Sequence, residues 1–421
     1  MSTLSLALRN LLHRPLTSGL SVLLAALGAG LVSLLLLLSW QLEQQFERNL
    51  AGINLVVGAK GSPLQLILSS MYHVDAPTGN IPLTSAAPFL NPRHPYIERA
   101  VPLSLGDSYR GRRIVGTRPN FFALYGAEIA EGRQWEEVMD VLAGAAAARS
   151  LGLSIGDEFR SSHGLIEDDL LTHEDAPPFR VVGILSPTGS VADELLLTPA
   201  ESLWAVHDSH DHEDHEGHDH APGEHHTAAY DITQPLTAYE DESITSLLLT
   251  FKGTSIAGLN MQRGINENTE MQAATPSIEI NRVYDSMGKG EAVLRRLAYV
   301  IVGVSVLSIF IGLYSSLDRR RGELALMRSL GARPGKLFSL LLIEGVLLAV
   351  VGALIGLAIS HLGLALIARY FSEAYRQDFA AGVWLNEEWY LILGAVIVGA
   401  LAAAIPALRA ARTDVHRTLS R

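Results

Sequence analysis

The sequence predicts an α-helical membrane domain of four transmembrane helices, with a mixed α/β extracytoplasmic domain inserted between spans 1 and 2. Two observations carry this prediction. The 421-residue chain is 48% hydrophobic and only 18% charged, which is typical of a membrane protein with a soluble part. It also contains four charge-free runs of 20 to 24 residues, each long enough to cross a ~30 Å hydrocarbon layer.

Two further features of the composition limit the function. The formal net charge of −12 argues against nucleic acid as a partner, because a nucleic-acid-binding surface needs an excess of Lys and Arg. The chain has no cysteine, so disulfides are excluded and any metal site must use His, Asp or Glu.

The first predicted span covers residues 17–40 and follows a short N-terminal segment, residues 1–16. Its ten leucines and two valines favour insertion by about 6 kcal/mol in total. A cleaved signal peptide would have a shorter apolar region followed by small residues, whereas "QLEQQFERNL" follows here. We therefore predict an uncleaved membrane anchor.

The other three spans are predicted at residues 297–317, 337–368 and 389–408. Lys and Arg concentrate in the three segments that we assign to the cytoplasm, and acidic residues outnumber them in the loop at 369–388. The cytoplasmic segments are residues 1–16, the loop at 318–336 and the tail at 409–421. The large domain at 41–296 then lies on the opposite side of the membrane.

The large domain has the pattern of a mixed α/β fold. The runs "INLVVGAK", "RRIVGT", "FRVVGIL" and "SLLLTF" predict short strands, and "EVMDVLAGAAAARSLGL" predicts a helix. Helical stalks are expected at both ends of the domain, because Leu42, Phe46 and Leu50 repeat every four residues and Ile280, Val283 and Met287 share a similar spacing. The two stripes either pack together and transmit motion or belong to ordinary linker helices.

The loop at 318–336 predicts a short amphipathic helix. It covers Glu323–Leu330 and ends at Gly331, with Pro334 beyond it. Leu326 and Leu330 form an apolar edge among charged side chains, a pattern suited to docking into a groove of a soluble partner. The alternative is that the arginines only set the membrane topology. The segment "GARPGKL" lacks the spacing and the Ser/Thr of a phosphate-binding loop, so ATP would have to be hydrolysed by another subunit.

At this point the chain resembles the MacB/FtsX-type permeases of ABC transporters. The resemblance rests on the topology, on "RRRGELALMRSLGARPGKL" and on "IEGVLLAVVGALIG". In the large domain "VGTRPNFFALYGAEIAEGRQW" and "LAGAAAARSLGLSIGDEF" resemble the MacB-like periplasmic core domain. The histidine-rich segment in the middle of the chain departs from the family pattern.

The resemblance implies a non-catalytic permease subunit of the type VII, mechanotransmission class, in the bacterial inner membrane with both termini cytoplasmic. A homodimer of this subunit would bind two ABC ATPase subunits, which bind and hydrolyse ATP, and no intrinsic cofactor is expected. The residues expected to couple the permease to the ATPase are Arg320, Arg321, Glu323, Leu326, Met327, Arg328, Leu330 and Gly331.

Few ionisable residues lie in the predicted spans. Glu344 is expected to form a structural ion pair with Arg328 or Arg333, because an unpaired carboxylate at membrane depth costs about 2.5–3.5 kcal/mol. His361 is expected to form a hydrogen bond between helices. Gly352 and Gly356, four residues apart, predict a close helix–helix contact.

The segment at 207–226, "HDSHDHEDHEGHDHAPGEHH", contains eight histidines and seven carboxylates and is predicted to be a flexible periplasmic insert. Imidazole and carboxylate without sulfur favour Zn²⁺, held in several exchanging sites of modest affinity. The candidate ligands are His207, His210, His212, His215, His218, His220, His225 and His226. A pH-responsive charge switch and a merely solvated loop are the alternatives.

The predicted function is a permease that transmits ATP-driven motion to its periplasmic domain, in the handling or uptake of zinc or another divalent metal. A periplasmic metal-binding protein would then be a further partner. One alternative is the export of a lipoprotein, peptide or drug, with the insert incidental. Another is a regulatory scaffold that activates a periplasmic enzyme.

Overall fold

A computed structural model describes residues 3–13, 15–164, 177–208, 230–253, 256–374 and 382–412. The chain forms two compact units. We call Met1–Glu43 together with Ser286–Arg421 the helical domain, and Gln44–Asp285 the α/β domain. Each unit is described by itself.

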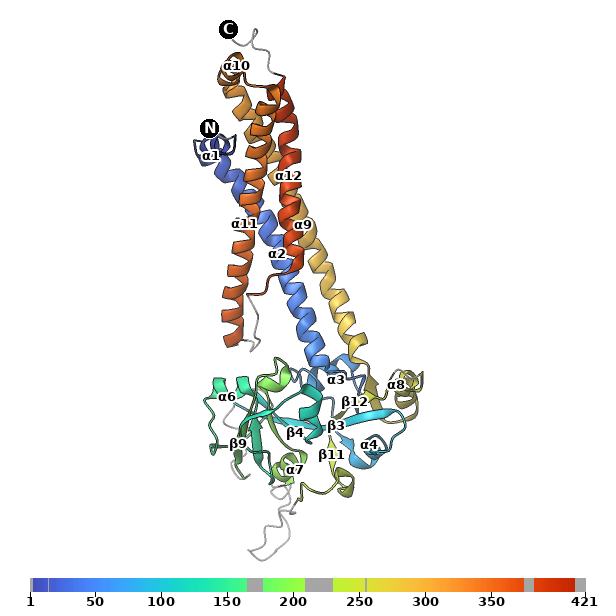
Figure 1. Cartoon of the computed structure of the whole chain (residues 1–421). Helices are drawn as coiled ribbons and strands as arrows, with labels where there is room; N and C mark the ends of the chain where they lie inside the picture. Colours follow the sequence, from blue (N-terminus) through green and yellow to red (C-terminus); the bar gives the residue numbers. More distant parts are fainter. Residues whose placement is uncertain are drawn as a thin grey trace, which may run out of the picture. The chain divides into compact units, whose positions relative to one another are not determined.

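The helical domain confirms the predicted membrane architecture (Figure 1). Among the described residues, four helices are long and apolar enough to cross a membrane. They are α2 (Pro15–Leu50), α9 (Pro276–Arg319), α11 (Pro334–Ala374) and α12 (Asn386–Ala411). The short helix α1 (Thr3–Leu12) precedes α2, and the short helix α10 (Arg321–Ser329) lies between α9 and α11. The helices exceed the predicted spans because polar residues at their ends continue the helical hydrogen bonding outside the apolar runs.

The α/β domain is built on a mixed, 11-stranded sheet in the described part of the chain. Nine strands follow the order β13-β1-β12-β3-β4-β10-β6-β9-β5, while β7 pairs with β9 and β8 with β3. The strands are β1 (Leu55–Ala59), β3 (Ile97–Tyr109), β4 (Arg112–Thr117), β5 (Ile129–Gly132), β6 (Asp140–Ala143), β7 (Glu158–Phe159), β8 (Ser162–His163), β9 (Phe179–Leu185), β10 (Leu196–Pro199), β12 (Ser246–Phe251) and β13 (Met271–Ala274).

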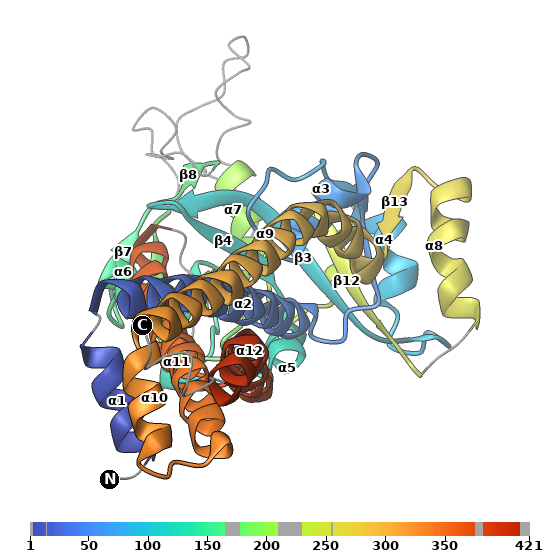
Figure 2. The same cartoon turned by 90° about the horizontal axis from the view of Figure 1, so that it is seen from above.

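Helices cover this sheet, and a two-stranded sheet of β2 (Ile81–Pro82) and β11 (Ser243–Ile244) lies beside them. The helices are α3 (Pro63–Ser70), α4 (Leu83–Leu90), α5 (Asn120–Tyr125), α6 (Ala145–Leu151), α7 (Ala200–Asp208) and α8 (Ile256–Asn268), with 3-10 turns η2 (Val191–Glu194) and η3 (Leu236–Ala238). Figure 2 shows α8 beside β13.

Central strands of the sheet are buried on both faces. In β1, Val56 packs into one hydrophobic cluster while its neighbours Leu55 and Val57 pack into another, because alternate side chains of a strand point to opposite faces. All three side chains are almost fully buried. This explains why the four predicted strands read as nearly continuous apolar runs rather than as alternating ones.

One predicted element is wrong in part. We predicted a helix through "EVMDVLAGAAAARSLGL", but Asp140–Ala143 forms strand β6 and only Ala145–Leu151 forms helix α6. Strand β6 pairs in parallel with β9 and is buried throughout. The strand and the helix are separated at Gly144. A Cβ at this position would lie 2.3 Å from Ala192 O, so the backbone here packs closely against a distant part of the chain. Local propensity, which alone favours a helix through this stretch, does not register that tertiary contact.

Parts of both predicted helical stripes, Phe46 and Leu50 on α2 and Ile280 on α9, join one core cluster of the α/β domain. Phe46 on α2 and Tyr284 on α9 pack edge to face, with ring centroids 6.0 Å apart. Both side chains, together with Leu50, pack against the main core cluster of the domain, and Ile280 is buried within it. Both helices are therefore anchored in the core of the α/β domain.

Candidate functional site

The short helix α10 lies across the tip of the helical domain (Figure 1). Gly331, with φ +95, closes it, which is the left-handed conformation that glycine adopts without steric cost. Leu326 is 55% exposed and Leu330 is 81% exposed. Together with Glu323 and Ser329, which are also exposed, they lie on one helical face, because residues three and four apart are neighbours on a helix surface.

The adjoining face of α10 packs onto the helical domain. Leu324 and Ala325 are buried, and Met327 packs against the same apolar cluster. Arg328 donates a hydrogen bond of 3.0 Å from Nη1 to the carbonyl of Ala411 near the end of α12. Met327 and Arg328, both predicted to couple to the ATPase, are thus turned inward, and the side chain of Arg321 lies outside the described residues. Glu323, Leu326 and Leu330 form the outward surface.

Arg320 joins α10 to the rest of the helical domain. Its Nη2 donates to Asn10 Oδ1 at 2.5 Å, and Asn10 Nδ2 donates to Glu344 Oε1 at 2.6 Å. Arg320 Nη1 also lies 3.8 Å from Glu344 Oε1. We expected Arg328 or Arg333 as the partner of Glu344, and the structure pairs it with Arg320. Asn10 belongs to α1, a helix that we did not predict within residues 1–16.

The two glycines of α11 contact α2 as the sequence spacing indicates. A Cβ added at Gly352 would lie 2.4 Å from Ala25 Cβ, and one added at Gly356 would lie 2.4 Å from Ala26 O. Such contacts leave no room for any side chain and bring the two backbones together.

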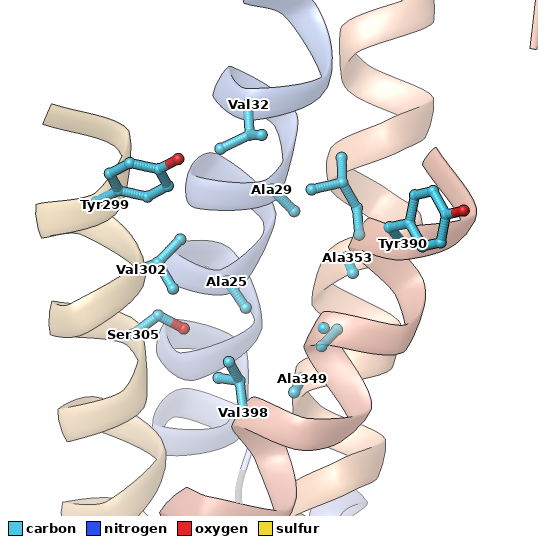
Figure 3. Close-up of a pocket in the computed structure, with 13 residues that line it drawn as sticks. Ala25, Ala29, Val32, Tyr299, Val302, Ser305, Ala349, Ala353, Tyr390 and Val398 are labelled. Carbon is cyan, nitrogen blue, oxygen red and sulfur yellow. The ribbon is translucent and has the colours of Figure 1, made fainter. Parts of the chain in front are cut away.

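A cavity of about 280 Å³ lies between the four long helices (Figure 3). Its lining is almost entirely apolar and includes Ala29 and Val32 from α2, Val302 from α9 and Ala353 from α11. Tyr299 and Tyr390 lie on opposite sides of the lining in Figure 3, and the hydroxyl group of Tyr390 points away from the other lining residues. Such a lining suits hydrocarbon rather than an ion, because it offers few polar ligands.

A polar cluster lies between α2, α11 and α12, and it confirms the interhelical hydrogen bond expected for His361, although its acceptor, Glu388, was not predicted. Glu388, fully buried, accepts hydrogen bonds from Ser33 Oγ at 2.8 Å, from His361 Nε2 at 3.0 Å and from Leu385 N at 3.2 Å. Ser33 Oγ and Ser360 Oγ are 2.7 Å apart. We placed Glu388 in the loop at 369–388, but it belongs to the first turn of α12. The signal for this position is its spacing: a Glu three residues after the residue that precedes a helix can cap that helix.

The described residues on either side of the stretch 209–229, His207 in α7 and Tyr230, both contact the α/β domain. His207 Nε2 lies 3.7 Å from Oδ1 of the buried Asp107. Tyr230 packs against Trp204 of α7 and against Tyr239, with ring centroids 5.6 Å apart in each case. The other candidate ligands, His210, His212, His215, His218, His220, His225 and His226, lie outside the described residues.

A metal site is not assembled in the part of the chain that the structure describes, where no group of three or more His, Asp and Glu side chains converges. His207 and Asp107 supply one imidazole and one carboxylate, which are donors that Zn²⁺ accepts. Two donors are fewer than the three or four protein ligands of ordinary zinc sites, so any further ligands would have to come from the segment beyond His207.

His73 is the most strongly perturbed histidine described in the α/β domain. Its side chain is buried beside Arg113, and burial, reinforced by the positive charge of Arg113, lowers its pKa from 6.5 to about 3. Neither ring nitrogen has a hydrogen-bond partner among the described residues. The imidazole is therefore neutral at all physiological pH values.

Comparison with known proteins yields two family matches. A model of the MacB-like periplasmic core domain matches residues 18–225, and a model of the FtsX-like permease C-terminal region matches residues 297–415. The second match contains α10 and its exposed leucines, as well as Glu344, His361 and Glu388.

Several curated proteins are similar to this chain. The macrolide export ATP-binding/permease protein MacB of Shewanella oneidensis is 23% identical over 340 residues, 79% of this chain and 47% of the relative. The uncharacterized ABC transporter permease YknZ of Bacillus subtilis is 26% identical over 167 residues, 38% of this chain and 39% of the relative. The alignments thus span less than half the length of these relatives.

Among solved structures, the periplasmic region of MacB from Actinobacillus actinomycetemcomitans matches 56% of this chain and 96% of its own, with 11% identity and a TM-score of 0.33. The chain is a multi-pass membrane protein with a periplasmic domain inserted between its first and second spans. From its four membrane-length helices and the two family models that cover most of its length, the chain belongs to the MacB/FtsX-type permeases of ABC transporters.

Proposed function

We propose that this permease receives the motion of a separate ABC ATPase through the exposed face of α10 and transmits it to the periplasmic α/β domain. The observation that carries the proposal is the pair of exposed leucines, Leu326 and Leu330, on a helix whose other face is fixed to the helical domain. Exposed leucines at an aqueous membrane end are unfavourable unless a partner covers them.

The proposal also assigns the topology. Because the α/β domain is periplasmic and is joined to α10 through the membrane-length helix α9, α10 and both termini lie in the cytoplasm. The arginines at Arg319, Arg320 and Arg328 agree with this orientation, since Lys and Arg accumulate on the cytoplasmic side. The subunit would work in the inner membrane, as a homodimer with two ATPase subunits.

The contacts of α10 indicate how force would travel. A displacement of α10 acts on α9 and α11 directly, since α10 lies between them in the chain, and Arg328 ties it to α12. Arg320 adds a link to α1 and to Glu344 on α11. A rigid attachment of this kind passes a push on α10 to several helices together instead of bending the loop.

The decisive variants are Leu326→Glu and Leu330→Glu. A carboxylate buried against the ATPase should weaken binding at least tenfold, a loss of about 1.4 kcal/mol or more. The measurement is copurification of the full-length permease with the ATP-binding subunit, identified by its phosphate-binding loop in mass spectrometry. Arg328→Glu is a poorer test, because Arg328 also binds the carbonyl of Ala411.

Ile155→Glu is the matched control, since Ile155 is 48% exposed on the α/β domain and undergoes the same chemical change. It should leave ATPase binding intact. If the two α10 variants bind the ATPase as well as Ile155→Glu does, the exposed face of α10 is not the coupling surface.

For the cargo, we favour export of a drug-like or peptide molecule. The support is the similarity to proteins named for macrolide export, in which the alignment covers 79% of this chain. The cavity in Figure 3 offers few ion ligands, in agreement with a route that does not carry metal ions through the four helices.

Zinc handling is the second candidate and rests on one feature, the histidine-rich segment at 207–226. Its first residue, His207, lies beside the buried carboxylate of Asp107, so a metal that uses His207 as a ligand would sit close to the folded domain. In this form of the proposal, Zn²⁺ is the cargo or the signal, and a periplasmic metal-binding protein is the partner. A regulatory scaffold for a periplasmic enzyme requires the same transmission of motion with a different outer partner.

A further inference from the structure

Helix α1 carries an exposed apolar stripe that the coupling function does not use. Leu4, Leu8 and Leu12 recur every four residues and are 50%, 45% and 77% exposed. The adjoining stripe, Ala7 and Leu11, packs on the helical domain, where Ala7 is fully buried. This amphipathic helix therefore has two adjoining apolar stripes: one packs against the protein, and the other, the leucine stripe, is exposed.

The orientation of α1 differs from that of the spans. In Figure 1 α1 is seen nearly end-on beside the bundle, and in Figure 2, after a turn of 90°, it is seen along its length. Its axis thus runs across the long axis of the four-helix bundle. A helix in this orientation lies parallel to the plane of the membrane that the bundle crosses.

The depth of α1 is fixed by Asn10, which donates to Glu344 on α11 at 2.6 Å. Glu344 follows the mostly apolar residues 337–343 and precedes the charge-free run at 345–368, so it lies near the cytoplasmic edge of the predicted span. The tip of α11 at Pro334 is ten residues away, about 15 Å at the helical rise per residue. Helix α1 therefore sits at the cytoplasmic edge of the span, whereas Leu330, next to that tip, lies farther out.

The bare stripe of α1 also continues into a surface that faces lipid. Leu16, Leu20, Leu23 and Leu27 of α2 are 88%, 55%, 52% and 49% exposed, on a membrane-spanning helix. Leu12 and Leu16 are separated only by the turn between α1 and α2. Arg9 is exposed on the polar side of α1, where it would meet anionic headgroups.

We propose that α1 is an interfacial helix whose Leu4, Leu8 and Leu12 face is immersed in the cytoplasmic leaflet, so that lipid and not the ATPase covers it. Through Asn10, which bridges Arg320 and Glu344, this helix holds the base of α10 at a fixed height relative to the bilayer surface. When the ATPase displaces α10, the membrane-bound helix α1 limits the movement of the base of α10, so that the displacement is transmitted to the membrane-spanning helices. The inference rests on the proposed function only for the role of α10.

The chain has no cysteine, so a single introduced cysteine can be labelled uniquely. Leu8→Cys, Arg9→Cys and Leu330→Cys are each labelled with an environment-sensitive fluorophore, and the full chain is reconstituted into vesicles of phosphatidylcholine and phosphatidylglycerol. Brominated phosphatidylcholine then serves as the quencher. We expect quenching of the label at residue 8 to be at least twofold stronger than at residues 9 and 330.

Equal quenching at residues 8 and 9 would show that the helix is not immersed along its leucine stripe and would overturn the inference. So would a label at residue 8 that is unaffected by lipid but shifts when the ATPase is added, because the partner would then be protein. A label at residue 330 that is strongly quenched by lipid would instead contradict the proposed function and leave the inference about α1 standing.

Discussion

His361 Nε2 lies 3.0 Å from Glu388 Oε1, so an imidazole on α11 and a fully buried carboxylate on α12 are hydrogen-bonded within a membrane-spanning bundle. Ser33 on α2 donates to the same oxygen at 2.8 Å. Three helices thus converge on one carboxylate at the end of the bundle where α12 begins. Glu388 Oε2 also accepts from the backbone N–H of Leu385, which caps that helix.

Removal of the Glu388 carboxylate should destabilise the helical domain. Glu388→Leu removes the acceptor that Ser33 and His361 share, which should cost about 1–3 kcal/mol. Glu388→Gln should cost clearly less, because an amide oxygen still accepts these bonds. Thermal unfolding in nanodiscs, followed by tryptophan fluorescence, measures the effect, since Trp384 stacks on His361 with centroids 5.7 Å apart.

Glu387 provides the control for this prediction, because it is the neighbouring glutamate and is exposed. Glu387→Leu should change stability by no more than about 0.5 kcal/mol. Equal unfolding temperatures for Glu388→Leu and Glu387→Leu would mean that the cluster contributes nothing to the stability of the bundle.

The contact between α2 and α11 predicts opposite effects for two glycine-to-alanine changes on the same helix. Gly356→Ala places a methyl group 2.4 Å from Ala26 O and should destabilise the protein by about 1–3 kcal/mol through overpacking. Gly363→Ala meets nothing within 4 Å and should be neutral or stabilising by up to about 1 kcal/mol through helix propensity. Unfolding of both variants in the same nanodiscs compares them; a Gly356→Ala variant as stable as Gly363→Ala would refute the close approach.

His73 predicts a loss of stability of the α/β domain in acid. Burial lowers its folded-state pKa to about 3, while in the unfolded chain it titrates near 6.5. Between these values the unfolded state binds a proton that the folded state does not. The free energy of unfolding therefore falls with decreasing pH from about 6.5 toward 3, by up to about 1.4 kcal/mol per pH unit from this group.

His73→Asn removes this titration and keeps a residue that tolerates the left-handed backbone, with φ +54 at this position. Hydrogen exchange of the β3 amides in the full-length protein, measured from pH 7 to pH 5, reports the stability of the domain. The slope against pH should be smaller in the variant than in the wild type. An unchanged slope would show that other groups govern acid unfolding.

The sequence predicted the membrane helices and the short helix of the 318–336 loop well because their signals are local. A charge-free run of 20 residues almost always forms a membrane-spanning helix. Gly331 followed by Pro334 ends the short helix through local backbone preferences, whatever the tertiary surroundings. Strands such as Phe179–Leu185 were found for the same reason, as β-branched runs between turn residues.

The partners within the site could not be predicted, because they depend on long-range packing. Asn10 and Glu344 are 334 residues apart, and nothing in the short segment around Asn10 marks it as a bridge to Arg320. Glu388 looked like an ordinary charge flanking a span, and its burial appears only when Ser33 and His361 are brought to it by the fold. The inward turn of Arg328 likewise depends on where α12 ends.

The histidine-rich segment makes the last prediction, which concerns metal binding by the intact protein. Deletion of residues 208–226 should abolish most Zn²⁺ binding measured by calorimetry in nanodiscs, because it removes seven of the eight candidate imidazoles. His207→Ala alone should have a smaller effect, since one ligand among many exchangeable ones is lost. His13→Ala, an exposed histidine on the helical domain, is the control and should bind Zn²⁺ like the wild type. Affinity and stoichiometry that survive the deletion would place any zinc site elsewhere and leave export as the function best supported by the chain.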